Sequence, residues 1–211
     1  MQTKLQQKAE KIIAFLSEMY PNSTIALNFN SPFELLVATI LSAQCTDKRV
    51  NIITEELFQY CRTPQDFARL PLEDLEKAIF SAGFYKNKSK NIKAAAEMIL
   101  EKFAGEVPDT MEELLELPGV GRKTANVVLG HCFGKPGIVV DTHVGRISRR
   151  LGLAKGNTPE KIEFELMEVL PQSEWIRSNH LMIDFGRAIC SSQNPKCNEC
   201  LLSTLCDFRK K

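Results

Sequence analysis

Residues 117–130 read LPGVGRKTANVVLG, and this stretch decides how the chain is interpreted. A Pro-Gly-Val-Gly turn leads directly into two cations and then into an apolar run. The residues before it, from Met111, and those after it, through Leu129, both have helical periodicity, so the sequence predicts two helices joined by a short corner. Gly119 and Gly121 are expected to give this corner positive φ angles and close approach of another backbone.

Two uses of this corner are open. Successive N–H groups in a glycine turn at a helix N-terminus bind anions, which suits one DNA phosphate held by the run Gly119, Val120, Gly121 and Arg122. The alternative is an ordinary helical hairpin, but Gly-Val-Gly followed at once by Arg-Lys favours phosphate binding. Lys123 lies in the first helical turn, where the positive end of the helix dipole disfavours an ammonium. If it is also sheltered, its amine is a nucleophile for aldehydic carbons; otherwise it is a solvated surface lysine.

A second candidate site follows eighteen residues later, at Asp141 in DTHVGRISRRLG (141–152). Asp141 is predicted to cap the next helix, because aspartate is a favoured N-cap residue. It is also a candidate catalytic carboxylate facing a cleft opposite Lys123, and both roles can hold together. His143 is predicted either to contact a phosphate or the pocket, or to be a hydrogen-bonded structural histidine.

Four of the seven cysteines fall within seventeen residues at the carboxyl end. Their spacing is Cys190-x6-Cys197-x2-Cys200-x5-Cys206, which predicts a metal centre, since four thiols this close in a reducing compartment typically bind metal. Only one CxxC pair is present, and the ferredoxin pattern is absent, so the spacing leaves zinc and an iron–sulfur cluster both open. The other three cysteines are interpreted as small buried thiols.

Composition places few limits on function. The 211 residues are 44% apolar and 25% charged, typical of a globular protein with one large or two modest domains. No apolar run approaches the ~20 residues that span a bilayer, and the polar amino terminus does not resemble a secretory signal, so a cytoplasmic location is expected. The net charge is +1, so any DNA contacts must be few and local. A monomer is the default expectation.

Helix-start signals recur along the chain, and strand signals are nearly absent. Ser31-Pro32-Phe33-Glu34, Thr63-Pro64, Thr158-Pro159 and the capping box at Thr110 each predict a helix N-terminus. Near the amino end, Leu5, Ala9, Ile12, Leu16 and Met19 follow a period of 3.6 residues. Only GIVV (137–140) reads as extended. These patterns predict an all-α fold of roughly ten helices, with one seam at the Gly- and Pro-rich stretch 133–140.

Taken together, these motifs resemble the endonuclease III family of base-excision DNA glycosylases. LPGVGRKTANVVL is similar to its helix-hairpin-helix, VDTHVGR to its catalytic-aspartate segment, and the cysteine tail to its 4Fe–4S loop. LSAQCTDKRVN (41–51) and AGFYKNKSKNI (82–92) match in kind and order. The resemblance runs from about residue 20 to residue 206.

The resemblance implies a two-lobed helix-hairpin-helix glycosylase fold with a DNA-binding cleft between the lobes. One lobe is a helical barrel at 25–135 that contains the hairpin at about 111–130. The other lobe joins 1–24 to 136–211 and carries one structural 4Fe–4S cluster in the loop 190–206. After Asn179-His180 the chain departs from the family, because LMIDFGRAIC lacks the usual tryptophan and histidine before Gly-Arg.

The resemblance also implies a bifunctional glycosylase and AP lyase that acts on double-stranded DNA. Its substrates would be oxidised or ring-saturated pyrimidines, such as thymine glycol, and abasic sites. The target base is flipped out, Lys123 attacks the sugar, Asp141 stabilises positive charge, and β-elimination cuts the strand 3′ to the lesion. Gln44 would fill the vacancy left by the flipped base, and Phe84, where relatives more often carry leucine, would be the wedge; a core aromatic is the alternative for Phe84.

Three other functions are weighed against this one. An adenine mismatch glycosylase typically lacks the hairpin lysine and carries an extra carboxyl-terminal domain, so Lys123 disfavours it. A non-catalytic DNA-binding module leaves the coincidence of Lys123 and Asp141 unexplained. A zinc protein of unrelated function would lack iron–sulfur absorption. The expected setting is a bacterial-type cytoplasm, with nucleoid association during action and no membrane partner.

Overall fold

The computed structural model describes residues 2–209, and all regular structure in that range is helical. It contains eleven α-helices and two short 3-10 helices, with no strand in the described part of the chain. The predicted all-α fold is therefore confirmed. GIVV (137–140) is extended without pairing, as expected of a run too short to form a sheet.

The chain divides into two compact units. One unit is continuous and comprises Ala26–Lys135. The other is discontinuous, because it combines the amino-terminal segment through Ile25 with the chain from Pro136 onward. The second boundary falls inside the Gly- and Pro-rich stretch 133–140.

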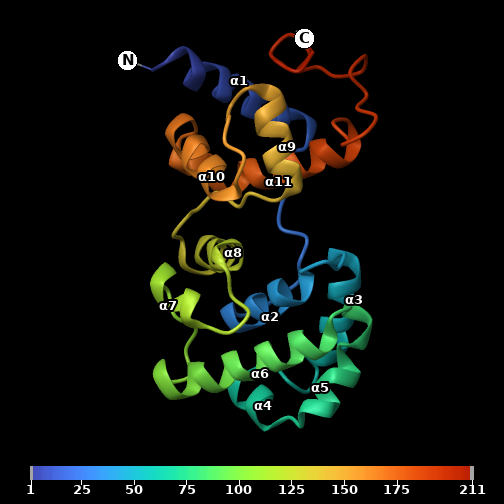
Figure 1. Ribbon diagram of the computed structural model, residues 1–211, viewed down its shortest axis with the longest axis vertical. Helices are drawn as coiled ribbons and strands as arrows, with labels where there is room; N and C mark the ends of the chain where they lie inside the picture. Colours follow the sequence, from blue (N-terminus) through green and yellow to red (C-terminus); the bar gives the residue numbers. More distant parts are fainter. Residues whose placement is uncertain (1, 210–211) are drawn as a thin grey trace. The chain divides into compact units, whose positions relative to one another are not determined.

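The discontinuous unit is built from four α-helices and a 3-10 turn around one apolar core (Figure 1). The elements are α1 (Lys4–Met19), α9 (Thr142–Leu151), α10 (Pro159–Val169), η2 (Gln172–Glu174) and α11 (Trp175–Ala188). Helix α11 packs against α9 and α1, and α10 packs against α9 and α1. The core therefore draws on both ends of the sequence.

Helix α1 joins this core through one amphipathic face. Ala9, Ile12 and Leu16 are fully buried, as their spacing predicts, whereas Leu5 at the same period is 38% exposed. Leu5 lies in the first turn of the helix. The apolar face of α1 is therefore buried from the second turn of the helix onward.

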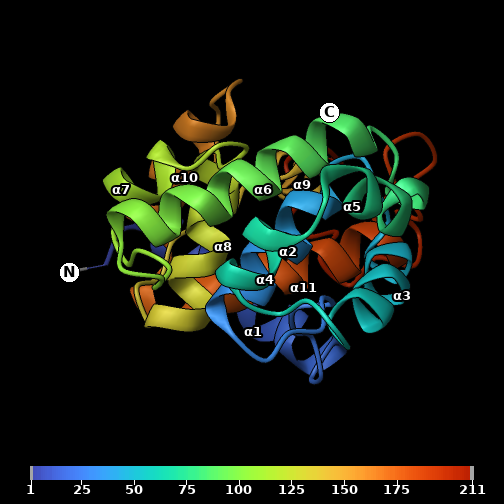
Figure 2. The ribbon, with the colours of Figure 1, turned by 90° about the horizontal axis from the view of Figure 1, so that it is seen from below.

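The continuous unit packs its helices around α6, which the view in Figure 2 shows passing α2, α4 and α5. The elements are α2 (Pro32–Ser42), α3 (Asp47–Leu57), α4 (Pro64–Arg69), α5 (Leu72–Ala78), η1 (Phe80–Ala82), α6 (Tyr85–Lys102), α7 (Met111–Glu116) and α8 (Arg122–Phe133). Helix α2 is buried almost all round and contacts α3, α6 and α8. It is the central helix of this unit, as its apolar sequence predicts.

The predicted helix caps are present. Ser31, Thr63 and Thr158 each accept a hydrogen bond from the backbone N–H three residues later, with proline following as the first helical residue. Thr110 caps α7 in the same way, but its hydroxyl also donates to the Glu113 carboxylate at 2.7 Å. Local capping chemistry therefore sets where these helices begin.

No helix among residues 2–209 combines the length and apolar character that a membrane crossing requires.

Candidate functional site

The predicted hairpin is present as α7, a turn at 117–121, and α8. Gly119 has a φ of +79°, a conformation that side chains rarely adopt. A Cβ atom placed on Gly119 would lie 2.8 Å from Cβ of Asn91 on α6. Glycine is therefore required here for two reasons: the left-handed backbone and the close approach of α6.

Gly121 differs from the expectation. Its φ is −104° with ψ at 175°, an extended conformation open to any residue, and a Cβ there would meet nothing within 4 Å. Gly121 does not use the positive φ that glycine allows, because this residue is the N-cap of α8 and takes the extended backbone of that position. As a glycine, it provides no side-chain cap hydrogen bond at the start of α8.

The next three residues have different exposures. Val120 is 8% exposed, and its N–H already donates to the carbonyl of Leu117 at 3.1 Å. Arg122 is half-buried, and Lys123 is exposed in the first turn of α8. The shelter expected around Lys123 is thus absent in the free protein. A bound partner would have to supply it.

The two predicted DNA-probing residues both lie in exposed turns of the continuous unit. Gln44 follows α2 with a φ of +55°, and Phe84 precedes α6 with a φ of +49°. The Phe84 side chain is 64% exposed, which excludes the alternative of a core aromatic. Left-handed backbone at a non-glycine residue costs of order 1–3 kcal/mol, and such strain clusters at binding sites.

Asp141 is the N-cap of α9. Its Oδ1 accepts a hydrogen bond from Val144 N–H at 2.8 Å, and the residue is half-buried. The predicted capping role is confirmed. A carboxylate has further lone pairs on its second oxygen, so capping leaves acceptor capacity.

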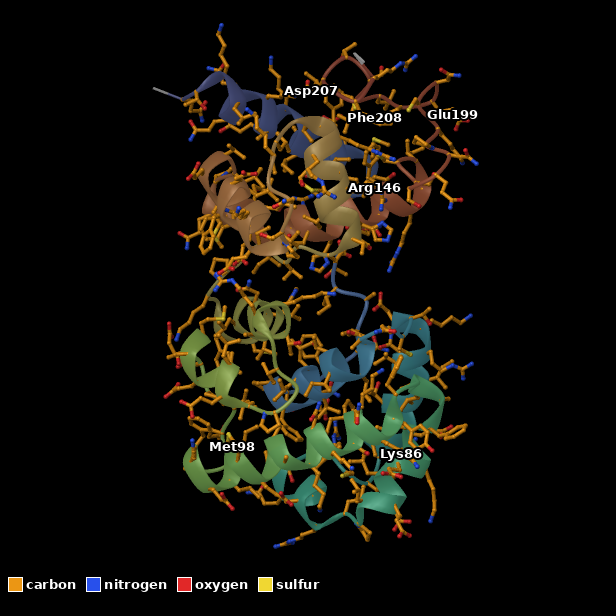
Figure 3. All side chains as sticks on the ribbon, in the orientation of Figure 1. Lys86, Met98, Arg146, Glu199, Asp207 and Phe208 are labelled. Carbon is orange, nitrogen blue, oxygen red and sulfur yellow. The ribbon has the colours of Figure 1, made fainter. Side chains whose placement is uncertain are left out.

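His143 lies one residue further along, in the first turn of α9. Its Nδ1 is 3.2 Å from Nη2 of Arg146, which Figure 3 labels on the same helix. Burial lowers the pKa of His143, Asp141 opposes that shift, and the Arg146 and Arg187 guanidiniums add to it. A Cβ on Gly186 would lie 2.6 Å from Nδ1 of His143, so α11 fits against this ring only with glycine.

The four carboxyl-terminal cysteines line one pocket, together with Arg150, Leu151, Phe185, Ile189, Pro195, Lys196 and Phe208. Burial raises the pKa of the Cys200 thiol, and the neighbouring Cys206, Cys190 and Cys197 thiols raise it further. All four sulfurs are therefore near one another. Within residues 2–209, however, no three His, Cys, Asp or Glu side chains are arranged so that they could hold a single metal ion.

Arg150 on α9 holds the start of the cysteine loop. Its guanidinium donates to the carbonyls of Ser191 at 2.6 Å and Ser192 at 2.8 Å, and to Cys190 Sγ at 3.4 Å. It also lies 4.7 Å from the ring centroid of Phe208, which Figure 3 labels beyond the last cysteine. One side chain thus binds both ends of the loop. Nothing in the cysteine spacing predicted this role.

Comparison with known proteins decides the family. Residues 37–172 match the HhH-GPD superfamily of base excision DNA repair proteins. Endonuclease III of Synechocystis sp. is 50% identical over 201 residues, which cover 95% of this chain and 92% of the relative. The chain belongs to the endonuclease III family. Its members are DNA glycosylases with AP lyase activity, so the predicted base-excision repair enzyme class is confirmed.

Two further comparisons support the family assignment. Endonuclease III of Bacillus subtilis is 47% identical over 192 residues, covering 90% of this chain and 88% of the relative. A solved structure of a trapped endonuclease III–DNA covalent intermediate superposes with a TM-score of 0.92 at 45% identity. The matched region covers all of this chain and 98% of the chain in the solved structure. The predicted DNA partner is thereby confirmed.

The residues 181–190, where the sequence is expected to depart from the family, contact their own unit. Asp184 accepts a hydrogen bond from the Ser23 hydroxyl at 2.5 Å, which ties α11 to the segment after α1. Phe185 is 1% exposed and fills the core of this endonuclease III unit. The altered residues thus pack within the unit that contains them.

Sequence reasoning missed Lys88 on α6. It is 5% exposed, while its neighbours Lys86 and Lys90 are exposed. The lysine-rich run YKNKSKNI gives no signal that separates the buried lysine from the exposed ones. The one available indication of its burial was the helical period of the flanking apolar residues, extended to position 88.

Proposed function

We propose that this endonuclease III homologue removes oxidised or ring-saturated pyrimidines, such as thymine glycol, and cleaves at abasic sites. The observation that carries the proposal is Lys123: an exposed primary amine in the first turn of α8, directly after the strained Gly119 corner. The adenine mismatch alternative is disfavoured by this lysine and by the endonuclease III relatives.

In the proposed reaction, the damaged nucleotide is first flipped out of the duplex, because its sugar carbon is unreachable in the stack. The free amine of Lys123 attacks C1′, forming a C–N bond while the glycosidic bond breaks and the base leaves with the bonding electrons. Loss of a proton from nitrogen and opening of the sugar give a Schiff base. Removal of a C2′ proton then expels the 3′ phosphate by β-elimination.

Asp141 is assigned the stabilisation of positive charge that develops on the sugar. Its Oδ1 is fixed by the cap hydrogen bond to Val144, so the carboxylate is held in one orientation. A pre-oriented charge lowers the barrier more than a mobile one, since no reorganisation is needed in the transition state. We also assign it a part in positioning or deprotonating Lys123.

The hairpin turn is proposed to hold one DNA phosphate. Uncapped N–H groups at the start of α8 and the adjacent Arg122 provide donors, and Gly121 leaves that surface open. Gln44 is assigned to the space vacated by the flipped base and Phe84 to the wedge. We also assign His143 to contact with a phosphate or the pocket; the lowered pKa favours a neutral ring there.

The four cysteines are proposed to hold one structural 4Fe–4S cluster. Their thiols surround one pocket, yet they are not arranged to hold a single ion. The endonuclease III relatives support this choice over zinc. A bound cluster would cross-link the loop 190–206.

We also propose that the enzyme is a cytoplasmic monomer that associates with the nucleoid when it acts. The bacterial origin of the relatives supports this location.

Borohydride trapping tests the mechanism. Wild-type protein, a thymine-glycol duplex and borohydride are expected to give a covalent protein–DNA adduct, because borohydride reduces the Schiff base to a stable amine. Lys123→Gln is expected to lose the adduct while binding DNA. Lys77→Gln is the matched control, since Lys77 is an exposed lysine of the same unit that pairs with Asp74 at 3.1 Å; it should trap like wild type. An adduct with Lys123→Gln would show that another amine is the nucleophile.

A further inference from the structure

The buried Lys88 ammonium joins two separate turns of the continuous unit. Its Nζ donates to the carbonyl of Leu41 at 2.8 Å and to the carbonyl of Ala82 at 3.0 Å. Leu41 lies in the last turn of α2, three residues before Gln44. Ala82 ends η1, two residues before Phe84. One cation therefore spans the segments that carry both proposed DNA-probing residues.

The backbone of Lys88 adds a third link. Its N–H donates to the carbonyl of Phe84 at 3.1 Å, and the N–H of Asn87 donates to the same oxygen at 3.1 Å. Lys88 thus holds the turn on both sides of Gly83, whose φ is +70°. Gly83 and Phe84 are consecutive residues with positive φ, and the non-glycine residue Phe84 keeps its left-handed conformation only where surrounding contacts hold it.

Burying a charged side chain costs free energy, which argues against a role for Lys88 that is limited to filling space. Lys88 as a whole residue is 5% exposed, and the partners of its Nζ are neutral carbonyls. Burial lowers the pKa of Lys88, and the nearby Cys45 opposes that shift. A methionine would fill similar space without burying a charge. What the ammonium adds is directional: up to three donors from one point, placed on carbonyls of two different turns.

We propose that Lys88 is a positioning residue that sets the turn carrying Gln44 in fixed register with the turn carrying Phe84. Gln44 and the wedge residue Phe84 then enter the duplex as one rigid pair. This inference rests on the roles proposed above for Gln44 and Phe84. Lys88 touches neither DNA nor the reacting atoms, so it acts only through these two residues.

The test compares two substrates under single-turnover conditions. A thymine-glycol duplex requires base flipping, whereas a single-stranded abasic oligonucleotide requires only the Lys123 amine and is followed by borohydride trapping. Lys88→Met is expected to slow excision from the duplex about 10- to 100-fold, the range that misplacement by ~1 Å produces. Trapping of the single strand should stay at the wild-type rate.

Lys93→Met is the matched control. Lys93 lies on the same helix and its Nζ donates to the carbonyls of Ala68 and Leu70 at the end of α4, at 2.5 Å and 2.9 Å. Its loss removes a similar lysine bridge to two backbone carbonyls, made by a half-buried side chain, without touching either probing turn. Both rates of this variant should match wild type at a temperature where it is folded.

The ratio of the two rates decides the outcome, because a general folding defect lowers both. If Lys88→Met does not fold, Lys88→Arg is used instead, because arginine keeps a cation with several donors but changes the shape of the group. Excision from the duplex by this variant should slow, while trapping of the single strand should stay at the wild-type rate. An unchanged ratio in the folded variants overturns the inference. Failure of wild-type protein to excise or trap refutes the proposed function instead.

A double-mutant cycle with Phe84→Ala separates positioning from an independent effect. If Lys88 acts by holding the wedge, the Lys88→Met and Phe84→Ala losses should not multiply. The double variant should be about as slow as the slower single variant. Multiplied losses would show that Lys88 affects catalysis by another route.

Discussion

Three lysines of the continuous unit illustrate how burial assigns a role to a side chain. Lys123, the proposed nucleophile, is exposed at a helix start, Lys88 is buried and holds two turns, and Lys93 holds the end of α4. The motif around Lys123 predicted its position on a hairpin. No comparable pattern marks Lys88, because its partners are carbonyls distant in sequence, and any residue type supplies those.

His131 provides a prediction at the scale of a single residue. Burial lowers its pKa below the usual value, so the folded state favours the neutral ring. The stability that this contributes is complete above the unfolded-state pKa near ~6.5 and is lost as pH falls through the folded-state pKa. Its ring protons should titrate below ~6.5 by NMR. In His131→Gln the denaturant midpoint should fall less on acidification than in wild type; an equal fall would exclude His131 as a source.

At the scale of elements, the α7–α8 corner shows which part of the site the sequence could predict. Capping residues are local signals, so the starts of α2, α4, α7 and α10 were predictable to the residue. The distinction between Gly119 and Gly121 was not, because it depends on Asn91 of α6 approaching Gly119. A two-glycine motif suggests two similar conformations, whereas the tertiary contact and the N-cap position make them different.

Alanine substitutions at the two glycines test this distinction. Gly119→Ala should destabilise the protein by about 1–3 kcal/mol, since the added methyl meets Cβ of Asn91 at 2.8 Å in a left-handed backbone. Gly121→Ala is the matched control, with open space and an extended φ, and should change stability by less than about 0.5 kcal/mol. Urea denaturation of both variants gives the comparison. Equal losses would mean that φ and Asn91 do not govern this corner.

At the scale of the whole molecule, each unit has its own buried core. The continuous unit is closed by neighbouring segments of sequence, but the discontinuous unit needs α1 from one end of the chain and α9 to α11 from the other. The sequence suggested a seam from its Gly- and Pro-rich composition. It could not show α1 packing on α10 and α11, because an amphipathic face does not specify its partner.

Matched core truncations are expected to act on one unit each. Leu16 in α1 and Leu35 in α2 are both fully buried, and replacing either by alanine should cost about 2–5 kcal/mol. Leu16→Ala should lower hydrogen-exchange protection in α9 to α11, and Leu35→Ala should lower it in α3 to α8. Loss of protection in both units from either variant would contradict independent cores.

The discontinuous unit also imposes an order on synthesis. A ribosome adds ~5–20 residues per second from the amino end, so Ala26–Lys135, including Lys123, is synthesised before α9 to α11. Helix α1 must wait for its partners with Ala9, Ile12 and Leu16 uncovered. The cysteines at 190–206 follow α11, so they are translated after every helix of this unit. The core of the discontinuous unit therefore closes only after α11 has been made, although α1 is translated first.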